Sequence, residues 1–530
     1  MKRFLKGLFL PITRLAAIYL VEIAITANIL MYVSGKYSGK AYWFDLALNV
    51  MRVITIACLI FVILSHRIEQ AYKANWVIVL VLSPSFGGLI YLLLAKEKPF
   101  LKRLQKTHRL RKKYEKCSLL RENDDSKSLR KNISEKARPY SKIANYLSNE
   151  HSFNIFSQTK PKFFASKEDG WSDALQAMRN ANESIFMEYY ILSEGRLLDQ
   201  IFEIAEKKVS DGVDVRMLYD DFGSFGKIRR KTIRRFRKAG IGIHEFNRVK
   251  ILVSQELNYR NHRKLMIIDG KTVYAGGANL ADEYAEKENK SLGYWFDTII
   301  RLDGDAANDA VAIFKQDWIF SAGRNAKPIE EHAGRIGIPD ARIESAESGM
   351  QNGACQLYAS SPLGHDSVSK DVFLSLLMQS SKSFHIITPY LILNEDVMEK
   401  LSFCAKSGLD IKIVVPGIPD KKSIYSSTKS HFSELISSGV KVYKYKKGFI
   451  HSKIMLSDDN CASIGSVNID YRSFFLNFEN GILLYDSPEI KRISETISDI
   501  LRDSEKVEYE KPSIFARTFS IFLKFISPML

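Results

Sequence analysis

One pattern of chemically reactive residues occurs twice in this chain, and the repeat constrains the fold more than any other feature. Each copy has a histidine, a lysine two residues later, an aspartate seven residues later and an asparagine seventeen residues later. A Gly-Gly or Gly-Ser pair precedes each asparagine. The copies are His262, Lys264, Asp269 and Asn279, and then His451, Lys453, Asp458 and Asn468. Two copies with one spacing indicate a duplicated unit.

Each copy contains half of what a phosphodiester-cleaving site would need. An imidazole can attack phosphorus or transfer a proton, and a nearby ammonium or amide can stabilise phosphate oxygens. We therefore predict the histidine, lysine and aspartate of both motifs as the catalytic set, with Asn279 and Asn468 binding substrate. Within that set, Asp269 and Asp458 are expected to brace the motif rather than to contact substrate.

The duplication extends well beyond the motif, because the same order of helices and strands is predicted on both sides of it. Glycines after helix ends and β-branched runs after them mark the boundaries. The first repeat is predicted as helix 173–180, strand 184–192, helix 196–209, strand 215–219, basic helix 227–238 and strand 241–246. The second is helix 372–379, strand 383–391, a helix ending at 407, strand 411–415, helix 426–437 and strand 440–445.

This alternation predicts an α/β fold with helices covering mixed or parallel sheets. We expect two domains, 143–345 and 346–510, related by a pseudo-twofold axis that brings both motifs into one site. The motif strands, 265–268 and 454–457, should hold each histidine and lysine on the same face.

The first hundred residues form a separate region with three long apolar runs, 15–33, 44–64 and 76–95. Their lengths approach those of helices that cross a bilayer, so residues 1–100 are predicted to be a transmembrane anchor. A cleaved signal peptide is the alternative for the first run. Residues 101–142 are predicted as a basic linker. The tail 511–530 is predicted as an amphipathic helix at the membrane interface, with a core helix as the alternative.

The chain carries a net charge of +17, which indicates an anionic partner. Nine of the eighteen residues from Lys96 to Lys113 are Lys or Arg, and this block places the large body on the cytoplasmic face by the positive-inside rule. The basic helix 227–238 is either a solvated face, a nucleic-acid surface or a lipid surface; the apolar runs favour lipid. Five scattered cysteines lack metal-binding spacing, so no metal and no cofactor is predicted.

The paired motif resembles the hallmark of the phospholipase D superfamily, and several other segments resemble bacterial cardiolipin synthases. These are 219–224, 258–264, 276–284, 388–390 and 468–474, together with the apolar run 76–95 and the apolar end of the chain. The resemblance covers nearly the whole chain. It departs at Phe296, where the family pattern Trp-Arg-Asp has arginine.

The resemblance implies a two-step reaction in a bacterial cell membrane. One histidine attacks the phosphorus of phosphatidylglycerol and releases glycerol, and the phosphatidyl group then passes to a second phosphatidylglycerol, giving cardiolipin. We assign His262 as nucleophile and His451 as general acid and base, although the sequence leaves these roles interchangeable. Asp297 and Glu479, downstream of their motifs, are implied to orient the imidazoles.

The expected partners are phosphatidylglycerol and other anionic membrane lipids, with no nucleic acid. Two other functions use the same residues: a hydrolytic phospholipase D, in which water replaces the lipid alcohol, and a membrane-tethered protein that binds anionic lipid or nucleic acid without turnover. Intact histidines in both motifs argue against the second.

Overall fold

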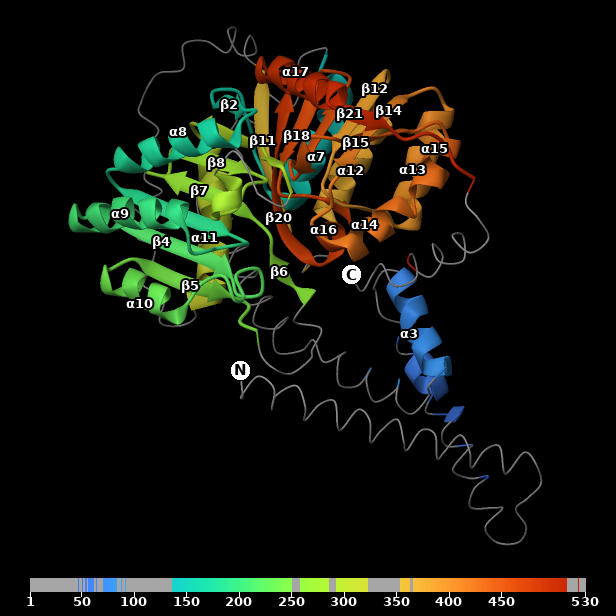
Figure 1. Cartoon of the computed structure of the whole chain (residues 1–530), viewed down its shortest axis with the longest axis horizontal. Helices are drawn as coiled ribbons and strands as arrows, with labels where there is room; N and C mark the ends of the chain where they lie inside the picture. The colour runs from blue at the N-terminus through green and yellow to red at the C-terminus, as the bar shows by residue number, and fades with distance from the viewer. Residues whose placement is uncertain are drawn as a thin grey trace. The chain divides into compact units, whose positions relative to one another are not determined.

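The computed structural model describes residues 136–249, 258–285, 292–322, 353–362 and 366–511, the helix α3 (Gln70–Leu82), and single positions or short stretches between 46 and 91 and at 523 (Figure 1). Contacts divide the chain into two compact units. The first comprises residues 1–100 with 249–257 and 529, and the second comprises 101–248 and 258–528 with 530. Apart from residues 249–257, both predicted domains therefore belong to the second unit.

In the first unit, a small buried cluster consists of Ile63, Trp76, Leu80 and Tyr91. The indole of Trp76 meets the Tyr91 ring edge to face at 5.2 Å. Within the described residues, no helix has the length and apolarity that a membrane crossing requires. The predicted span 15–33 lies outside the described residues, as do parts of 44–64 and 76–95 and nearly all of 511–530.

The first repeat forms a seven-stranded sheet in the order β2-β10-β8-β7-β3-β4-β5. β3, β4 and β5 run parallel to one another, whereas β7, β8, β10 and β2 join by antiparallel pairs. In sheet order the bounds are Lys160–Phe164, Ile299–Asp303, Thr272–Gly276, Lys264–Ile268, Ser184–Tyr189, Asp214–Asp220 and Gly242–Phe246.

The second repeat has the same seven-strand arrangement within a ten-stranded sheet, β11-β20-β18-β17-β12-β14-β15, with β12, β14 and β15 parallel. In sheet order the bounds are Ala354–Ser360, Asn477–Tyr485, Cys461–Gly465, Ile454–Ser457, Ser383–Ile387, Asp410–Pro416 and Lys441–Tyr445. β1 (Ile155–Phe156) and β21 (Ser504–Lys506) extend its two edges. The predicted α/β duplication is thus present, with the first repeat teal to yellow-green and the second orange to red (Figure 1).

Helices cover both faces of the first sheet. α8 (Lys167–Arg179), α9 (Arg196–Ser210) and α10 (Arg230–Lys238) share a core with the strand residues Ile185, Met217 and Ile243. The alternate residues of the same strands, such as Phe186 and Leu218, pack with α11 (Ala307–Ala322) in a second core that continues into the other repeat. This shared core explains why the two repeats form one compact unit.

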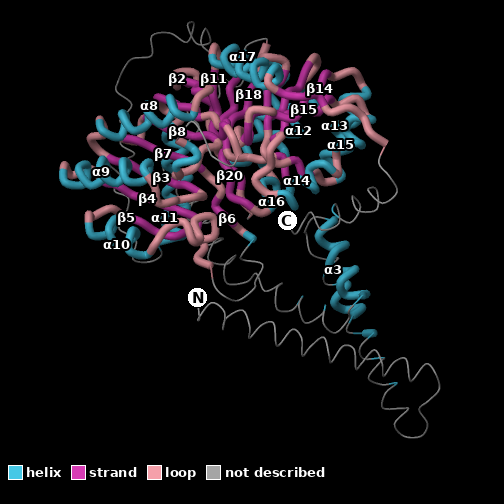
Figure 2. Tube along the Cα trace, in the orientation of Figure 1, coloured by secondary structure: helices cyan, strands magenta, loops and turns pink. Residues whose placement is uncertain are grey.

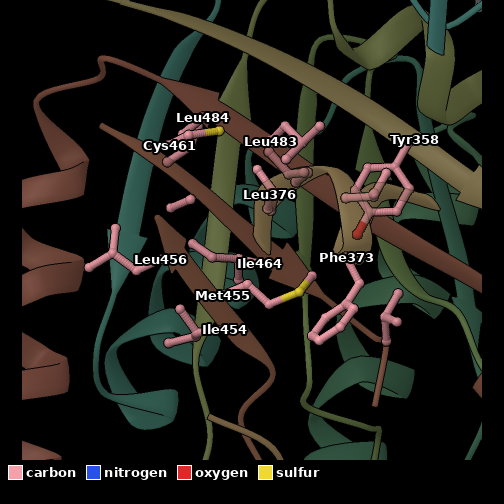
Figure 3. Packing of buried hydrophobic residues seen from close by; sticks show 14 of the residues in the cluster. Tyr358, Phe373, Leu376, Ile454, Met455, Leu456, Cys461, Ile464, Leu483 and Leu484 are labelled. Atoms are coloured by element: carbon pink, nitrogen blue, oxygen red, sulfur yellow. The ribbon is translucent and has the colours of Figure 1, made fainter. Parts of the chain in front are cut away.

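The second repeat has corresponding helices: α12 (Val368–Gln379), α13 (Glu395–Lys406), α14 (Lys422–Lys429), α15 (Phe432–Ser437), a short α16 (Tyr471–Phe475) and α17 (Glu489–Arg502) (Figure 2). Phe373 and Leu376 of α12 lie beside Met455 of β17 in the buried core (Figure 3). These contacts fix the strand that follows the second motif histidine.

Several predicted boundaries need correction. The strand expected at 383–391 ends at Ile387, because Pro389 has no backbone N–H for the sheet. The helix expected at 426–437 is two helices, α14 and α15, divided at Ser430, whose hydroxyl donates to the carbonyl of Ser427 at 2.6 Å. The basic helix begins at Arg230 rather than at 227.

The first domain does not begin at 143 as predicted. A 3-10 turn (Arg138–Tyr140), the helix α7 (Ser141–His151) and β1 pack against the second repeat instead. The phenol of Tyr140 lies 2.6 Å from the Ser457 hydroxyl, and the Gln356 amide donates to the carbonyls of Ala144 and Phe153. The chain therefore crosses from the second repeat to the first between β1 and β2.

Candidate active site

Two short parallel strand pairs join the repeats at the motif histidines. β6 (Arg260–Asn261) pairs with the start of β20, and β16 (Gly448–Ile450) pairs with β9 (Tyr294–Phe296). Each pairing continues into a backbone hydrogen bond from a histidine: His262 N donates to Phe478 O at 2.9 Å, and His451 N to Phe296 O at 2.8 Å. The two contacts are reciprocal, as a twofold relation requires.

This pairing places each histidine beside the carboxylate of the other repeat. His262 Nδ1 lies 3.0 Å from both Oε1 and Oε2 of Glu479, and His451 Nδ1 lies 2.7 Å from Oδ2 of Asp297. The two carboxylates that contact Nδ1 are the ones the resemblance implied as orienting residues, but the pairing is crossed between the repeats. The reason is that the parallel strand pairs bring residue 262 level with 479 and residue 451 level with 297.

Both histidines and both carboxylates are buried. The exposed fractions are 8% for His262 and 6% for His451, and Glu479 and Asp297 are fully buried. Among the described residues, each imidazole forms hydrogen bonds only through Nδ1. A carboxylate at Nδ1 fixes the tautomer with the proton on that nitrogen, which leaves Nε2 with a free lone pair.

The two lysines lie against their own histidines. Lys264 Nζ donates to the carbonyl of His262 at 2.6 Å, and its backbone N–H donates to Asn480 Oδ1 at 3.1 Å. Lys453 Nζ donates to the carbonyl of His451 and lies 3.0 Å from its Nδ1. Each histidine and lysine thus lie together as predicted, but the histidines precede the strands β7 and β17, and Lys453 precedes β17 as well.

Burial dominates the electrostatics of this cluster. It lowers the pKa of His262 to about 4, against the opposing effect of Glu479, and lowers the pKa of His451 to about 3, with Lys453 acting in the same direction. Burial also lowers the pKa of Lys264 to about 7 and that of Lys453 to about 8. Both imidazoles are therefore neutral at pH 7.

The carboxylates respond in the opposite sense. Burial raises their pKa, but His451 and Lys453 together lower the pKa of Asp297 below its usual value. His262 and Lys264 do the same for Glu479. Both carboxylates are thus anionic, and they balance the two ammonium groups.

One aromatic ring and one buried ion pair lie beside His262. The Tyr190 ring meets the imidazole edge to face at 4.9 Å. Arg263, the next residue, donates from Nε to the carbonyl of Glu479 at 3.2 Å and forms a buried ion pair with Asp317. Sequence reasoning missed this ion pair; the signal was a charged residue between two motif residues, where the second motif has Ser452.

Three aromatic rings lie around His451 instead. The rings of Tyr284, Trp295 and Phe449 lie 5.2, 5.6 and 5.9 Å from the imidazole. The hydroxyl of Ser452, at the position of Arg263, lies 2.6 Å from that of Thr298. Sequence reasoning assigned no role to these rings. Their periodicity gave no signal, because they come from three separate segments.

Asn279 and Asn468 occupy equivalent positions but have different partners. Asn279 Oδ1 accepts from the backbone N–H of Ile191 at 3.1 Å. Asn468 Nδ2 donates to Asp470 Oδ2 at 3.2 Å, and its buried Oδ1 has no hydrogen-bond partner among the described residues.

Asp269 and Asp458 lie at the far ends of the strands from the lysines. Both have φ of +52°. Asp269 accepts from the backbone N–H groups of residues 182, 183 and 184, and Asp458 from those of 381, 382 and 383. Each therefore holds the start of the neighbouring strand, β3 or β12, as the bracing interpretation expected.

The glycine pair after each motif strand has a steric reason in the first repeat. A Cβ at Gly277 would lie 2.1 Å from Oδ1 of Asp297. The second repeat has Ser466 there, and its hydroxyl donates to Glu479. Phe296 stands where the family pattern has arginine. The centre of its ring lies 6.1 Å from that of Tyr294 and 6.0 Å from that of Tyr445.

Within the described ranges, no group of three His, Cys, Asp or Glu side chains is arranged to hold a metal ion. The site instead consists of two imidazoles, two ammonium groups and two carboxylates. Such a set can attack a phosphodiester, transfer protons and neutralise a phosphoryl group with protein groups alone.

Comparisons with known proteins agree with this chemistry. The family model described as cardiolipin synthase, PLD-like domain, matches residues 174–318 and 373–501, together more than half of the chain. The chain is 32% identical to "Cardiolipin synthase 2" of Bacillus cereus, over 90% of this chain and 89% of that one. It is 31% identical to "Cardiolipin synthase" of Halalkalibacterium halodurans, over 95% and 99%.

A solved structure supports the fold. The phosphatidylserine synthase of Haemophilus influenzae superposes with a TM-score of 0.55 and 16% identity, covering 75% of this chain and all of that one. The duplicated motif, the two matched domains and the relatives over nearly the full length lead to one conclusion. The chain belongs to the cardiolipin synthase family of phospholipase D-like enzymes.

Proposed function

We propose that this protein synthesises cardiolipin by transferring a phosphatidyl group from one phosphatidylglycerol to another, at a single site formed by both repeats around a pseudo-twofold axis. The observation that carries this proposal is the crossed pair of contacts, His262 with Glu479 and His451 with Asp297. Because each histidine depends on a carboxylate of the other repeat, neither motif is a complete site.

In the first step, Nε2 of His262 attacks phosphorus. The imidazole is ready for this because its pKa of about 4 leaves it neutral, and Glu479 holds the proton on Nδ1. The bond between phosphorus and the glycerol oxygen breaks as the phosphorus–nitrogen bond forms. His451 donates a proton to the leaving glycerol.

His451 must gain that proton when substrate binds. Its pKa of about 3 applies to the site without phosphate. An anionic phosphodiester beside the ring favours the charged imidazolium, and Asp297 at 2.7 Å stabilises it. Lys264 and Lys453, with Asn279 and Asn468, would balance charge on the transferring phosphoryl group.

The second step reverses the proton transfer. Neutral His451 takes the proton from the glycerol hydroxyl of a second phosphatidylglycerol, whose oxygen attacks phosphorus and displaces His262. The products are cardiolipin and free His262, so two phosphatidylglycerols give one cardiolipin and one glycerol. Asp269 and Asp458 act through the strands that they hold, without contact with the lipid.

We infer a membrane location for this reaction, with the described catalytic body on the cytoplasmic face of a bacterial membrane. The apolar runs within residues 1–100 and the basic block after Ala95 support that placement. The substrate partner is then phosphatidylglycerol within an anionic membrane.

The test is turnover of labelled phosphatidylglycerol by purified protein in mixed micelles. Cardiolipin with an equal amount of glycerol is the expected result. Phosphatidic acid without cardiolipin would instead mean a hydrolytic phospholipase D, and binding without either product would mean a non-catalytic protein.

A further inference from the structure

Two loops occupy equivalent places in the two repeats, and neither has a role in the chemistry above. Residues 221–229 follow β4, and residues 417–421 follow β14; we call them the rim loops. β4 and β14 are the middle members of their parallel strand triplets. The duplication has therefore placed one loop beside each motif histidine.

Each rim loop contacts a tyrosine that lies near a motif histidine. In the first, the Ser224 hydroxyl donates to the carbonyl of Tyr190, whose ring lies on His262 at 4.9 Å. A Cβ at Gly223 would lie 2.4 Å from the same carbonyl oxygen, so the loop packs closely there. Asp220, where β4 ends, also accepts from the N–H of Asn261, next to His262, at 2.9 Å.

The second rim loop repeats this arrangement. The Tyr390 phenol donates to Oδ2 of Asp420 at 2.6 Å. The Tyr390 ring lies 6.4 Å from that of Phe449, which in turn lies 5.9 Å from the His451 ring. Both loops therefore border the same site, from opposite repeats.

The rim loops expose large apolar side chains. Phe222 is 54% exposed, Phe225 62% and Ile418 39%. Among the described residues from 136 to 511, only six large apolar side chains are exposed, and these are three of them. Two loops at one site are thus unusually apolar at their tips.

Lysine and arginine residues lie next to these apolar side chains in sequence. Arg230 and Lys231 follow the first loop, and Lys421 and Lys422 end the second; all four side chains are exposed, and no ion pair is described for any of them.

We propose that the rim loops dock onto an anionic bilayer, placing Phe222, Phe225 and Ile418 among the lipid headgroups while the adjoining cations bind lipid phosphates. Apolar tips gain by leaving water, and neighbouring Lys and Arg are attracted to an anionic surface. Phospholipid would then reach the histidines directly from the membrane. This proposal rests on the proposed function, because only a phospholipid substrate requires the site to face a bilayer.

The first experiment detects contact. The full chain, carrying p-benzoylphenylalanine in place of Phe222, is reconstituted in vesicles of phosphatidylglycerol and phosphatidylcholine and irradiated. Phe403, on α13 and 66% exposed, is replaced in the same way as the matched control. A phospholipid mass adduct at position 222, at least fivefold above that at 403, supports the proposal; equal adducts, or none at 222, would overturn it.

The second experiment asks whether contact matters for turnover. Replacing Phe222, Phe225 and Ile418 by serine should lower activity on phosphatidylglycerol vesicles, relative to monomeric dihexanoyl phosphatidylglycerol, by at least fivefold. Phe403→Ser serves as the control. An unchanged ratio in a variant that still makes cardiolipin would overturn the docking proposal and leave the proposed function intact.

A third experiment tests the role of the lysine charges and distinguishes a lipid surface from nucleic acid. Lys421→Glu with Lys422→Glu should reduce vesicle activity more at high than at low phosphatidylglycerol content. Single-stranded DNA that competes with vesicles and crosslinks at position 222 more efficiently than lipid would assign the loops to nucleic acid instead. If the wild-type protein makes no cardiolipin in micelles, the proposed function itself fails.

Discussion

The two histidines are held by the same backbone arrangement but lie in different surroundings. Both donate a backbone hydrogen bond across the repeat interface and both place Nδ1 on a carboxylate. Behind His262 the chain has placed a buried ion pair, Arg263 with Asp317. His451 has an aromatic setting, with a pair of hydroxyls at the equivalent point.

The residues shared by the two motifs are those that the proposed reaction needs, whereas the residues that differ around them are those that the fold allows to vary. The imidazole, the ammonium and the carboxylate are present in both repeats, and in the proposed reaction each transfer step uses both sets. The side chains next to the motif residues differ because, at these positions, each repeat needs only buried groups that fill the space and have hydrogen-bond or ionic partners. Burial of His262 among charged groups and of His451 among rings lowers both pKa values in the same direction.

The largest effect is expected from the histidines themselves. His262→Ala and His451→Ala should each lower kcat by at least about 10⁴-fold, since residues that act as a unit fail together. They should differ in what accumulates: the His451→Ala enzyme should retain a covalent lipid adduct, and His262→Ala should not. Mass spectrometry of the denatured protein measures this, and an adduct on the His262→Ala enzyme would reverse the assigned roles.

The next largest loss of kcat is expected from replacing the two carboxylates. Glu479→Gln and Asp297→Asn should each lower kcat by about 10³-fold or more, because an amide no longer holds the proton on Nδ1 and cannot stabilise the imidazolium. Steady-state cardiolipin formation measures the loss. Glu399→Gln, on the exposed face of α13, is the matched control and should stay within twofold of wild type.

The ion pair and the hydroxyl pair should differ in stability. Arg263→Met leaves Asp317 buried without its cation and should cost about 3–5 kcal/mol. Ser452→Ala removes one hydroxyl contact and should cost about 1 kcal/mol. Denaturant unfolding in detergent compares them, with Arg230→Met as the exposed control. Equal costs would mean that the two surroundings are energetically alike.

The pH dependence follows from the lysines. Their pKa values of about 7 and 8 mean that both ammonium charges are present below pH 7 and are lost as pH rises through 8. We expect kcat/KM to fall by up to tenfold per pH unit above pH 7 and by up to a hundredfold per unit above pH 8, where both charges are lost. In acid it should fall only near pH 4, where His262 gains a proton. Lys264→Arg should move the start of the alkaline fall from about pH 7 to about pH 8, and a profile flat to pH 10 would contradict this account.

The bracing aspartates should affect turnover least. Asp458→Asn should lower stability by about 1–2 kcal/mol, because an amide is a weaker acceptor for the three backbone N–H groups of residues 381–383. Asp459→Asn, exposed and next in sequence, is the control. A loss of kcat above 10²-fold in Asp458→Asn, with stability unchanged, would return this residue to the catalytic set.

Much of this arrangement was predictable from the sequence, since spacing identified both motifs, and glycines followed by β-branched runs identified the duplicated α/β order. The crossed carboxylates were not, because Asp297 and Glu479 follow their own motifs in sequence and only the pairing of β9 with β16 and of β6 with β20 exchanges them. That pairing joins residues far apart in the chain and leaves no local pattern.

Other features were missed for local reasons. From the sequence, Arg263 had no role of its own, yet its side chain is only 3% exposed and forms a buried ion pair with Asp317. The prediction of a single helix at 426–437 did not allow for serine hydroxyls, which compete with backbone N–H groups for backbone carbonyls. Residues 143–156 were assigned to the first domain by proximity in sequence, although β1 pairs with β11 and the Gln356 amide bonds to the carbonyl of Ala144.

The central claim is that each histidine is oriented by the other repeat, and single-turnover adduct formation tests it most directly. In the His451→Ala background, a phosphatidyl ester with a p-nitrophenol leaving group needs no general acid, so only His262 and its carboxylate matter. Glu479→Gln should then slow adduct formation by at least about 10²-fold, whereas Asp297→Asn should slow it less than tenfold. The reverse order would show that each carboxylate serves its own repeat.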